Sequence, residues 1–239
     1  LHVANPSAFR DYVRFFVPED GKNLNRVFPG KKDGTLSERI AWTITEKLQS
    51  KADYYIDLHA GDTREEVMPF VYYNVAAGEK IARVSANMAM AADMEVRASS
   101  TATTGAYSSA CQRGLPAILM ERGGGGKFTD SEVQAYKRDV KNIMIRMGLL
   151  SGEEVHTVQQ KNVTRAEYLE AETDGLWYPV FSAGDTFAGG AVLGTVRDIW
   201  GNLLREYRAD YPGIVLYQTV GLGVKAGDPL IAYGEYVDR

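Results

Sequence analysis

The sequence predicts an α/β region followed by a small all-β region, and two observations carry this prediction. In the first part, short apolar runs alternate with longer segments in which apolar residues recur at helical spacing. Such alternation is typical of βαβ units, so we expect a mostly parallel or mixed sheet with helices on both faces. From about residue 158 the helical periodicity ends, and short β-prone runs are separated by glycines. The expected regions are therefore 1–157 and 158–239.

Capping motifs and periodicity locate the elements of the first region. Thr35-x-x-Glu38 and Thr129-x-x-Glu132 are capping boxes that mark the starts of helices. The first residues are expected to form a short strand, followed by a polar loop to residue 30 of a kind that often carries function. The elements expected next, in chain order, are a helix over 36–50, a strand over 53–59, a β-rich run over 69–74, a helix over 79–94, a short helix over 105–113, a strand over 116–121 and a helix to about Met147.

The second region contains a loose internal repeat. Ser182–Thr186 and Lys225–Pro229 share an Ala-Gly-Asp core, and an apolar run follows each of them. Two matching hairpin halves predict a small barrel or sandwich. The polar segment Ser151–Glu154 is a plausible linker before it.

Composition excludes several classes of protein. The 239 residues include 45% hydrophobic and 24% charged residues, as in ordinary globular proteins. A net charge of -4 gives no basic surface for nucleic acid, and no apolar run is long enough for a membrane span. The single cysteine, Cys111, excludes an internal disulfide, so we expect a cytoplasmic protein. Nothing in the composition argues against a homo-oligomer.

The stretch that ends in Asp57-Leu58-His59 is the first candidate for chemistry. Strand side chains alternate, so Asp57 and His59 should lie on one face, where the imidazole could bind a metal and the carboxylate could orient it. A histidine that merely caps a strand end is the alternative. Glu121 also ends a strand, before Gly123–Gly126, and could act as a general base. In an α/β sheet both positions fall at the carboxyl edge, where ligands bind.

Three residues of the first loop complete the candidate set. Arg26 and Asn25 offer a guanidinium fork and an amide suited to a carboxylate, and Arg14 could stabilise an oxyanion. Together with His59 and Glu121, these groups suit hydrolysis of an amide on a carboxylate-bearing substrate. Surface ion pairs for the arginines, and a turn cap for Asn25, are the alternatives.

The order of three motifs resembles a known family. Asn23–Gly30 (Asn-Leu-Asn-Arg-Val-Phe-Pro-Gly), Ala52–His59 and Gly114–Gly123 are similar to segments of the succinylglutamate desuccinylase/aspartoacylase family, within the zinc carboxypeptidase-like superfamily. The resemblance covers nearly the whole chain. It implies a zinc carboxypeptidase-like α/β fold and a second domain like biotinyl/lipoyl modules. That second domain lacks a carrier lysine, since the turn at Tyr211–Gly213 has none.

The resemblance also implies roles for individual residues. His59 matches a zinc ligand with Asp57 behind it, Glu121 matches the base that activates water, and Arg14 matches, more loosely, the arginine that stabilises the carbonyl oxygen. Asn25 and Arg26 match the pair that holds the substrate carboxylate, and Tyr107 matches a substrate-contacting tyrosine. Family members with an aspartate substrate have an arginine where this chain has Cys111, which argues against N-acetylaspartate. An acetylated diamino acid of the kind met in ectoine breakdown is compatible.

The front of the chain departs from the family pattern. Family members take two zinc ligands from a His-x-x-Glu motif, and this sequence contains none. We therefore expect an N-terminal part upstream of Leu1 to be missing, with the other two ligands in it; a metal-free relative is the alternative.

The expected function is a zinc-dependent amidohydrolase that deacylates a small N-acyl amino acid. The alternatives are a metal-free protein that binds acyl amino acids without cleaving them, and a zinc carboxypeptidase that acts on peptides.

Overall fold

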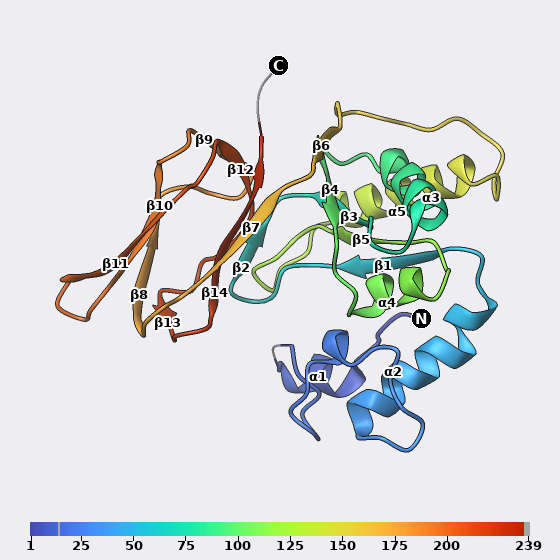
Figure 1. The fold of residues 1–239 in the computed structure, drawn as a ribbon, viewed down its shortest axis with the longest axis horizontal. Coiled ribbons are helices and arrows are strands. Elements are labelled where there is room, and N and C mark those ends of the chain that lie inside the picture. The colour runs from blue at the N-terminus through green and yellow to red at the C-terminus, as the bar shows by residue number, and fades with distance from the viewer. Residues whose placement is uncertain (14, 237–239) are drawn as a thin grey trace.

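The computed structural model describes residues 1–13 and 15–236, and it shows an α/β half beside a β half (Figure 1). A mixed sheet with helices forms the first half, and further antiparallel sheets form the second. The predicted fold class is therefore confirmed.

The sheet of the α/β half is mixed. Its strand order is β1-β5-β3-β4-β6, in which only the β3–β5 pair is antiparallel. The strands are β1 (Tyr55–His59), β3 (Phe70–Asn74), β4 (Val96–Ser100), β5 (Ala117–Glu121) and β6 (Lys161–Val163).

The helices follow the predicted order, and both capping boxes form. The backbone N–H of Thr35 donates to Glu38 Oε2 at 2.9 Å, and that of Thr129 donates to Glu132 Oε2 at 2.8 Å. The helices are α1 (Pro6–Asp11), α2 (Leu36–Lys47), α3 (Glu79–Ala91), α4 (Ala106–Gln112) and α5 (Asp130–Arg146), with short 3₁₀ turns at Leu24–Arg26 and Gln49–Lys51. Within the described part of the chain, no helix is both long and apolar enough to cross a membrane.

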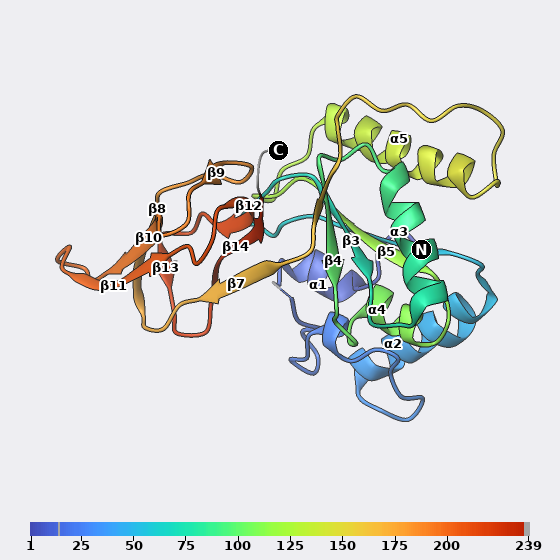
Figure 2. The same ribbon diagram turned by 45° about the horizontal axis from the view of Figure 1, so that its top comes forward.

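Helices cover both faces of the mixed sheet, as Figure 2 shows. Side chains of α3 and α5 pack on one face, against Val71, Ile118 and Met120. Side chains of α4 pack on the opposite face, against Tyr55 and Leu119. Because strand side chains alternate, His59 and Glu121 lie on the α4 face.

The expected strand at the start of the chain is wrong. Residues 1–5 form no strand, and α1 follows them. The side chain of Asn5 accepts a hydrogen bond from the Ala8 N–H at 3.2 Å, and Pro6 occupies the first turn. An N-cap asparagine followed by proline starts a helix, and this local signal outweighs the β-prone character of Leu1–Val3.

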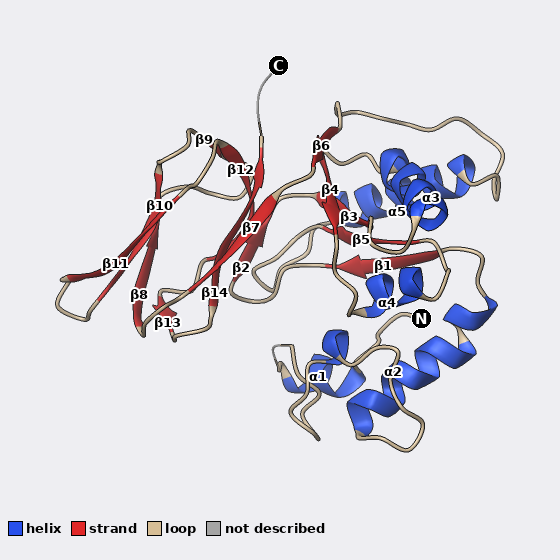
Figure 3. Cartoon of the chain, in the orientation of Figure 1, coloured by secondary structure: helices blue, strands red, loops and turns tan. Residues whose placement is uncertain are grey.

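Two antiparallel sheets pack face to face in the β half (Figure 3). Trp177, Leu193, Val215 and Leu230 come from both sheets and share one core. One sheet contains β8 (Gly175–Pro179), β10 (Val192–Arg197), β11 (Leu203–Arg208) and β13 (Gly223–Val224); the other contains β2 (Glu65–Val67), β7 (Ala166–Glu170), β12 (Gly213–Thr219) and β14 (Pro229–Glu235), with β9 (Thr186–Phe187) paired to β12.

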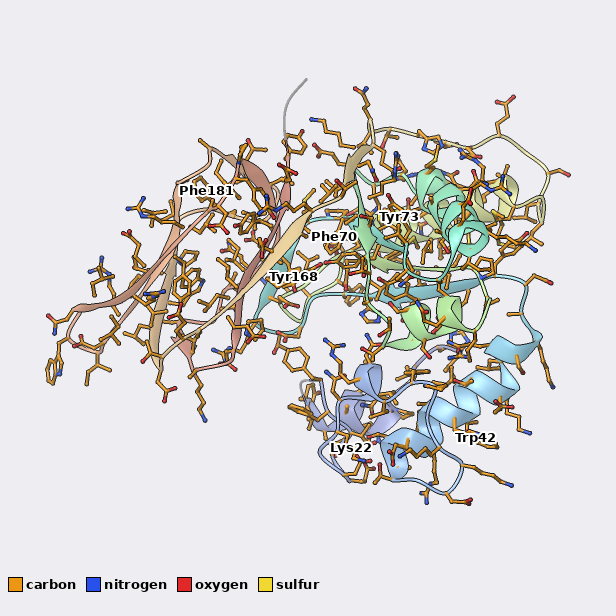
Figure 4. All side chains as sticks on the ribbon, in the orientation of Figure 1. Lys22, Trp42, Phe70, Tyr73, Tyr168 and Phe181 are labelled. Atoms are coloured by element: carbon orange, nitrogen blue, oxygen red, sulfur yellow. The ribbon has the colours of Figure 1, made fainter. Side chains whose placement is uncertain are left out.

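Two short strands cross between the halves. β2 lies early in the chain but pairs with β12 of the β half, and β6 lies after residue 158 but pairs with β4 of the α/β half. The cluster around Phe70, Val96, Ile214 and Leu216 joins the two halves, and Figure 4 labels Phe70 at their junction. The two-domain division at residue 157 stays a prediction.

Candidate active site

The ends of β1 and β5 bring His59 and Glu121 together. The two strands are parallel neighbours, and the Cα atoms of His59 and Glu121 are register partners. Nδ1 of His59 lies 3.4 Å from Oε1 of Glu121. Two residues that are far apart in the sequence therefore form one polar centre on the α4 face of the sheet.

Asp57 completes this centre from two residues back on β1. Its Oδ2 atom lies 3.4 Å from Nε2 of His59, so the imidazole sits between two carboxylates. The side chains of Asp57, Glu121 and His59 are 15%, 17% and 31% exposed, so the imidazole is the most accessible of the three. Oδ2 of Asp57 is buried and has no hydrogen-bond partner within the described structure.

The environment of His59 favours positive charge. Burial lowers the pKa of His59, but the nearby carboxylates of Asp57 and Glu121 outweigh this effect, and the pKa lies well above the ordinary value. The pair of carboxylates thus creates a site for positive charge at the strand ends.

The glycine run after Glu121 is packed against the loop that follows His59. Gly125 N–H lies within hydrogen-bonding distance of Asp62 O at 2.8 Å and Glu65 O at 2.9 Å. A Cβ atom on Gly124 would lie 2.3 Å from Glu65 O, so a side chain there would force the two loops apart. The glycines allow this close approach beside the polar centre.

Asn25 and Arg26 lie in the 3₁₀ turn of the first loop. Oδ1 of Asn25 accepts a hydrogen bond from the Ala106 N–H at 2.7 Å, which ties the loop to the start of α4. Arg26 is exposed, and its Nη1 donates to the Asn25 carbonyl at 3.1 Å. The guanidinium is therefore oriented by its own loop and accessible to a ligand.

Tyr107 and Cys111 both lie on α4 and are buried. Burial raises the pKa of the Tyr107 hydroxyl and also that of the Cys111 thiol. The sulfur lies 3.7 Å from Ser85 Oγ and 3.5 Å from the carbonyl oxygen of Ala117. Cys111 thus fills the protein interior as a neutral thiol and behaves as a small hydrophobic residue rather than a nucleophile.

Tyr72 of the α/β half meets tyrosines of the β half next to this face, and the sequence did not point to these residues. The hydroxyls of Tyr72 on β3 and Tyr168 on β7 are 2.9 Å apart, and the rings of Tyr168 and Tyr217 have centroids 6.5 Å apart. Burial, then neighbouring tyrosines and the charge of Glu121, raise the pKa of Tyr72. Strand periodicity alone cannot show that side chains from two sheets meet, and Figure 4 shows Tyr168 at the junction.

The structure thus brings together some of the predicted site residues. Asp57, His59 and Glu121 form one cluster, and Asn25 contacts the helix that carries Tyr107. Arg14 lies outside the described residues.

His59, with Asp57 beside it, fits one ligand position of a zinc site. Catalytic zinc has three protein ligands, and a ligating imidazole usually has a carboxylate on its other nitrogen. His59 has Asp57 at Nε2, which leaves Nδ1, on the Glu121 side, for a metal. Among residues 1–13 and 15–236, no group of three His, Cys, Asp or Glu side chains could hold a metal ion.

A comparison with family sequence models decides the family. The model of the succinylglutamate desuccinylase/aspartoacylase catalytic domain matches residues 1–147. The chain belongs to this family. The resemblance inferred from the three motifs is thereby confirmed.

One relative of known name and two solved structures support this assignment. N-alpha-acetyl-L-2,4-diaminobutyric acid deacetylase of Halomonas elongata is 29% identical over 230 residues, which are 92% of this chain and 67% of the relative. The product-bound structure of the ectoine utilization protein EutE (DoeB) from Ruegeria pomeroyi has a TM-score of 0.88 at 27% identity, covering 98% of this chain and 73% of that one. A succinylglutamate desuccinylase from a Silicibacter species has a TM-score of 0.81 at 27% identity, covering 97% and 72%.

Proposed function

We propose that this protein is a zinc-dependent hydrolase that cleaves the amide bond of a small N-acylated amino acid. The observation that carries the proposal is the pairing of His59 with Glu121, whose Nδ1 and Oε1 atoms lie 3.4 Å apart at the ends of adjacent strands. Membership of the family supports it, and so does the deacetylase activity named for the Halomonas relative. A cytoplasmic location remains a prediction from the lone cysteine.

The reaction adds water across the amide, so that a C–O bond forms, the C–N bond breaks, and a carboxylate and an amine leave. Glu121 would take a proton from the attacking water and deliver it to the departing nitrogen. Bound zinc would polarise the amide carbonyl and make water more acidic. His59 would be one zinc ligand, with Asp57 orienting its imidazole, and a catalytic zinc needs two further protein ligands.

The first loop supplies the binding groups. Arg26 would hold the substrate carboxylate through its guanidinium, and Asn25 would donate from its amide to the same group. Tyr107 on α4 would contact the substrate, and Arg14 would stabilise the carbonyl oxygen.

The residue at position 111 narrows the substrate. A second carboxylate on the amino acid would need a positive partner, and Cys111 is a buried neutral thiol. N-acetylaspartate is therefore disfavoured. An acetylated diamino acid, as in the name of the Halomonas relative, is the first substrate to test.

A Glu121→Gln variant tests the proposed role of Glu121 as the base. We expect turnover of N-acetyl-2,4-diaminobutyrate to fall about 10²–10⁴-fold, because the amide cannot accept a proton. The zinc content, measured by elemental analysis, should stay at about one ion per chain, since His59 is unchanged. Near-normal turnover by the variant would contradict the assignment.

The same protein decides between the proposal and its alternatives. A metal-free binding protein would contain no zinc and would bind the acyl amino acid, as measured by calorimetry, without cleaving it. A carboxypeptidase would release C-terminal residues from peptides faster than it cleaves acyl amino acids.

A further inference from the structure

The carbonyl groups at the ends of β1 and β5 share a hydrogen-bond donor from helix α5. The hydroxyl of Tyr136 donates to the carbonyl oxygen of His59 and lies 3.1 Å from that of Met120. Tyr136 therefore bridges the two strands directly behind the residues that carry the candidate chemistry. A phenol has one proton, so the two carbonyls share it.

Two backbone hydrogen bonds continue the pairing of the two chain segments at this point. The N–H of Arg122 donates to the same His59 carbonyl over 3.4 Å, and the N–H of Gly61 donates to the carbonyl oxygen of Gly123 at 2.9 Å. The 3.4 Å bond is long and contributes little. Tyr136 thus supplements the weaker of the two contacts, the one at the His59 carbonyl.

A second contact from α5 anchors the residue after Glu121. Nη2 of Arg122 lies 2.8 Å from Oδ2 of Asp139, whose side chain is fully buried, and the guanidinium sits 5.6 Å from the centre of the Tyr136 ring. Tyr136 and Asp139 are three residues apart, so they lie on the same face of the helix. One face of α5 therefore contacts β5 and the residue after it at two positions, Met120 and Arg122, which flank Glu121.

Tyr136 cannot touch a substrate at the candidate site. Its ring packs with Ile118 and Met120 on the face covered by α3 and α5, whereas His59 and Glu121 point to the α4 face. Burial, and then the charge of Glu121, raise the pKa of Tyr136, so the hydroxyl keeps its proton and remains a donor.

We propose that Tyr136 is a positioning residue, which fixes the distance between the imidazole of His59 and the carboxylate of Glu121 by bridging the backbone of their two strands. This role rests on the proposed function, because it matters only if His59 binds zinc and Glu121 moves the proton. It adds α5, on the far side of the sheet, to the elements that set the geometry of the site.

The test is Tyr136→Phe, with Tyr73→Phe as the matched control. Tyr73, labelled in Figure 4, is a buried tyrosine of β3 on the face of the mixed sheet that α5 covers. Its hydroxyl donates to Asn162 Oδ1 at 2.8 Å, away from the site. Each variant keeps its ring and loses one hydroxyl, so both should lose similar thermal stability. Only Tyr136→Phe should alter the site.

We expect Tyr136→Phe to lower kcat by about tenfold with KM within about twofold, the lower end of the range for groups that orient metal ligands. Zinc should also pass to a chelator several times faster than from the wild type, and this second measurement needs no turnover. Tyr73→Phe should match the wild type in both measurements.

Three other results would contradict either the positioning role of Tyr136 or the proposed function. If Tyr136→Phe matches the wild type in kcat and in zinc release, the positioning role is wrong while the proposed function stands. If Tyr73→Phe loses as much kcat as Tyr136→Phe, general loosening of the sheet explains both. If the wild type binds no zinc and cleaves no N-acyl amino acid, the proposed function fails, and this role fails with it.

Discussion

Oδ1 of Asn25 accepts a hydrogen bond from the backbone N–H of Ala106 at 2.7 Å. One side chain thus joins the loop that carries Arg26 to the helix that carries Tyr107. Because Oδ1 caps the helix, the amide NH₂ of Asn25 is the part that can donate to a substrate carboxylate.

Two substitutions separate these two tasks of Asn25. Asn25→Ala should lower the unfolding free energy by about 1 kcal/mol, as for loss of a helix cap, and should raise KM by about tenfold. Asn25→Asp keeps the acceptor and should retain the wild-type melting temperature, but its charge should raise KM further. A wild-type KM in the aspartate variant would contradict carboxylate binding by Asn25.

Arg26→Ala should raise KM by about 10–100-fold and leave the melting temperature unchanged. The guanidinium is exposed and bonds within its own loop, so the fold does not depend on it. The KM of Arg26→Lys should lie between those of the wild type and Arg26→Ala, because an ammonium keeps the charge but cannot form the bidentate pair. Arg205→Ala, which removes an exposed arginine paired with Glu172, is the control and should leave KM unchanged. Equal effects at both arginines would indicate a general electrostatic influence on the substrate.

Gly30 ends the Asn-Arg-x-Phe-Pro-Gly motif against helix α2. It has a φ of +84°, and a Cβ atom there would lie 2.2 Å from Trp42 N. Gly30→Ala should therefore cost about 3 kcal/mol or more in unfolding free energy and should raise KM by shifting Arg26. Gly201 has a similar φ of +89° but open space around it, so Gly201→Ala should cost only about 1 kcal/mol. Urea unfolding of the pair measures the difference, and equal costs would show that conformation alone matters.

Asp93 makes stability depend on pH. Burial raises the pKa of Asp93, but hydrogen bonds from the Thr157 hydroxyl and the Thr157 and Val158 N–H groups, together with the charge of Arg138, outweigh it, so the pKa is lowered. A lowered pKa in the folded state stabilises the protein above the unfolded pKa of about 3.9, and this stabilisation is lost as the pH falls through the folded value.

Unfolding by urea at a series of pH values tests this dependence. Asp93→Asn should cost about 1–3 kcal/mol at neutral pH, because an amide cannot replace both oxygens of the buried carboxylate as hydrogen-bond acceptors, and the difference in unfolding free energy from the wild type should become smaller below about pH 4. Thr157→Val removes one of the hydrogen bonds to Asp93 and should cost about 1 kcal/mol of unfolding free energy. This difference from the wild type should also become smaller over the same pH range. A gap that stays constant to low pH would show that Asp93 acts through packing.

Local signals in the sequence were sufficient for much of the α/β half. The capping boxes at Thr35 and Thr129 start α2 and α5, and the Asp57-x-His59 pattern places both side chains on one strand face. These features depend on neighbours within four residues, which the sequence displays directly.

The parts that were missed depend on distant partners. β2 and β6 have only three residues each, and their pairing with β12 and β4 supplies a stability that no local pattern records. The contact of Tyr136 with His59 joins residues 77 positions apart. The sequence predicted the helix that contains Tyr136, but the partners of its hydroxyl follow from how α5 crosses the sheet.

β2 and β6 each pair with a strand of the other half, and this affects how the protein unfolds. A cut at residue 157 would leave β2 attached to one fragment without β12, and would take β6 from the edge of the mixed sheet. Neither fragment would then hold a complete set of strands, and the shared cluster around Phe70 and Leu216 would be opened to water. The chain should therefore denature in a single cooperative step rather than one half at a time.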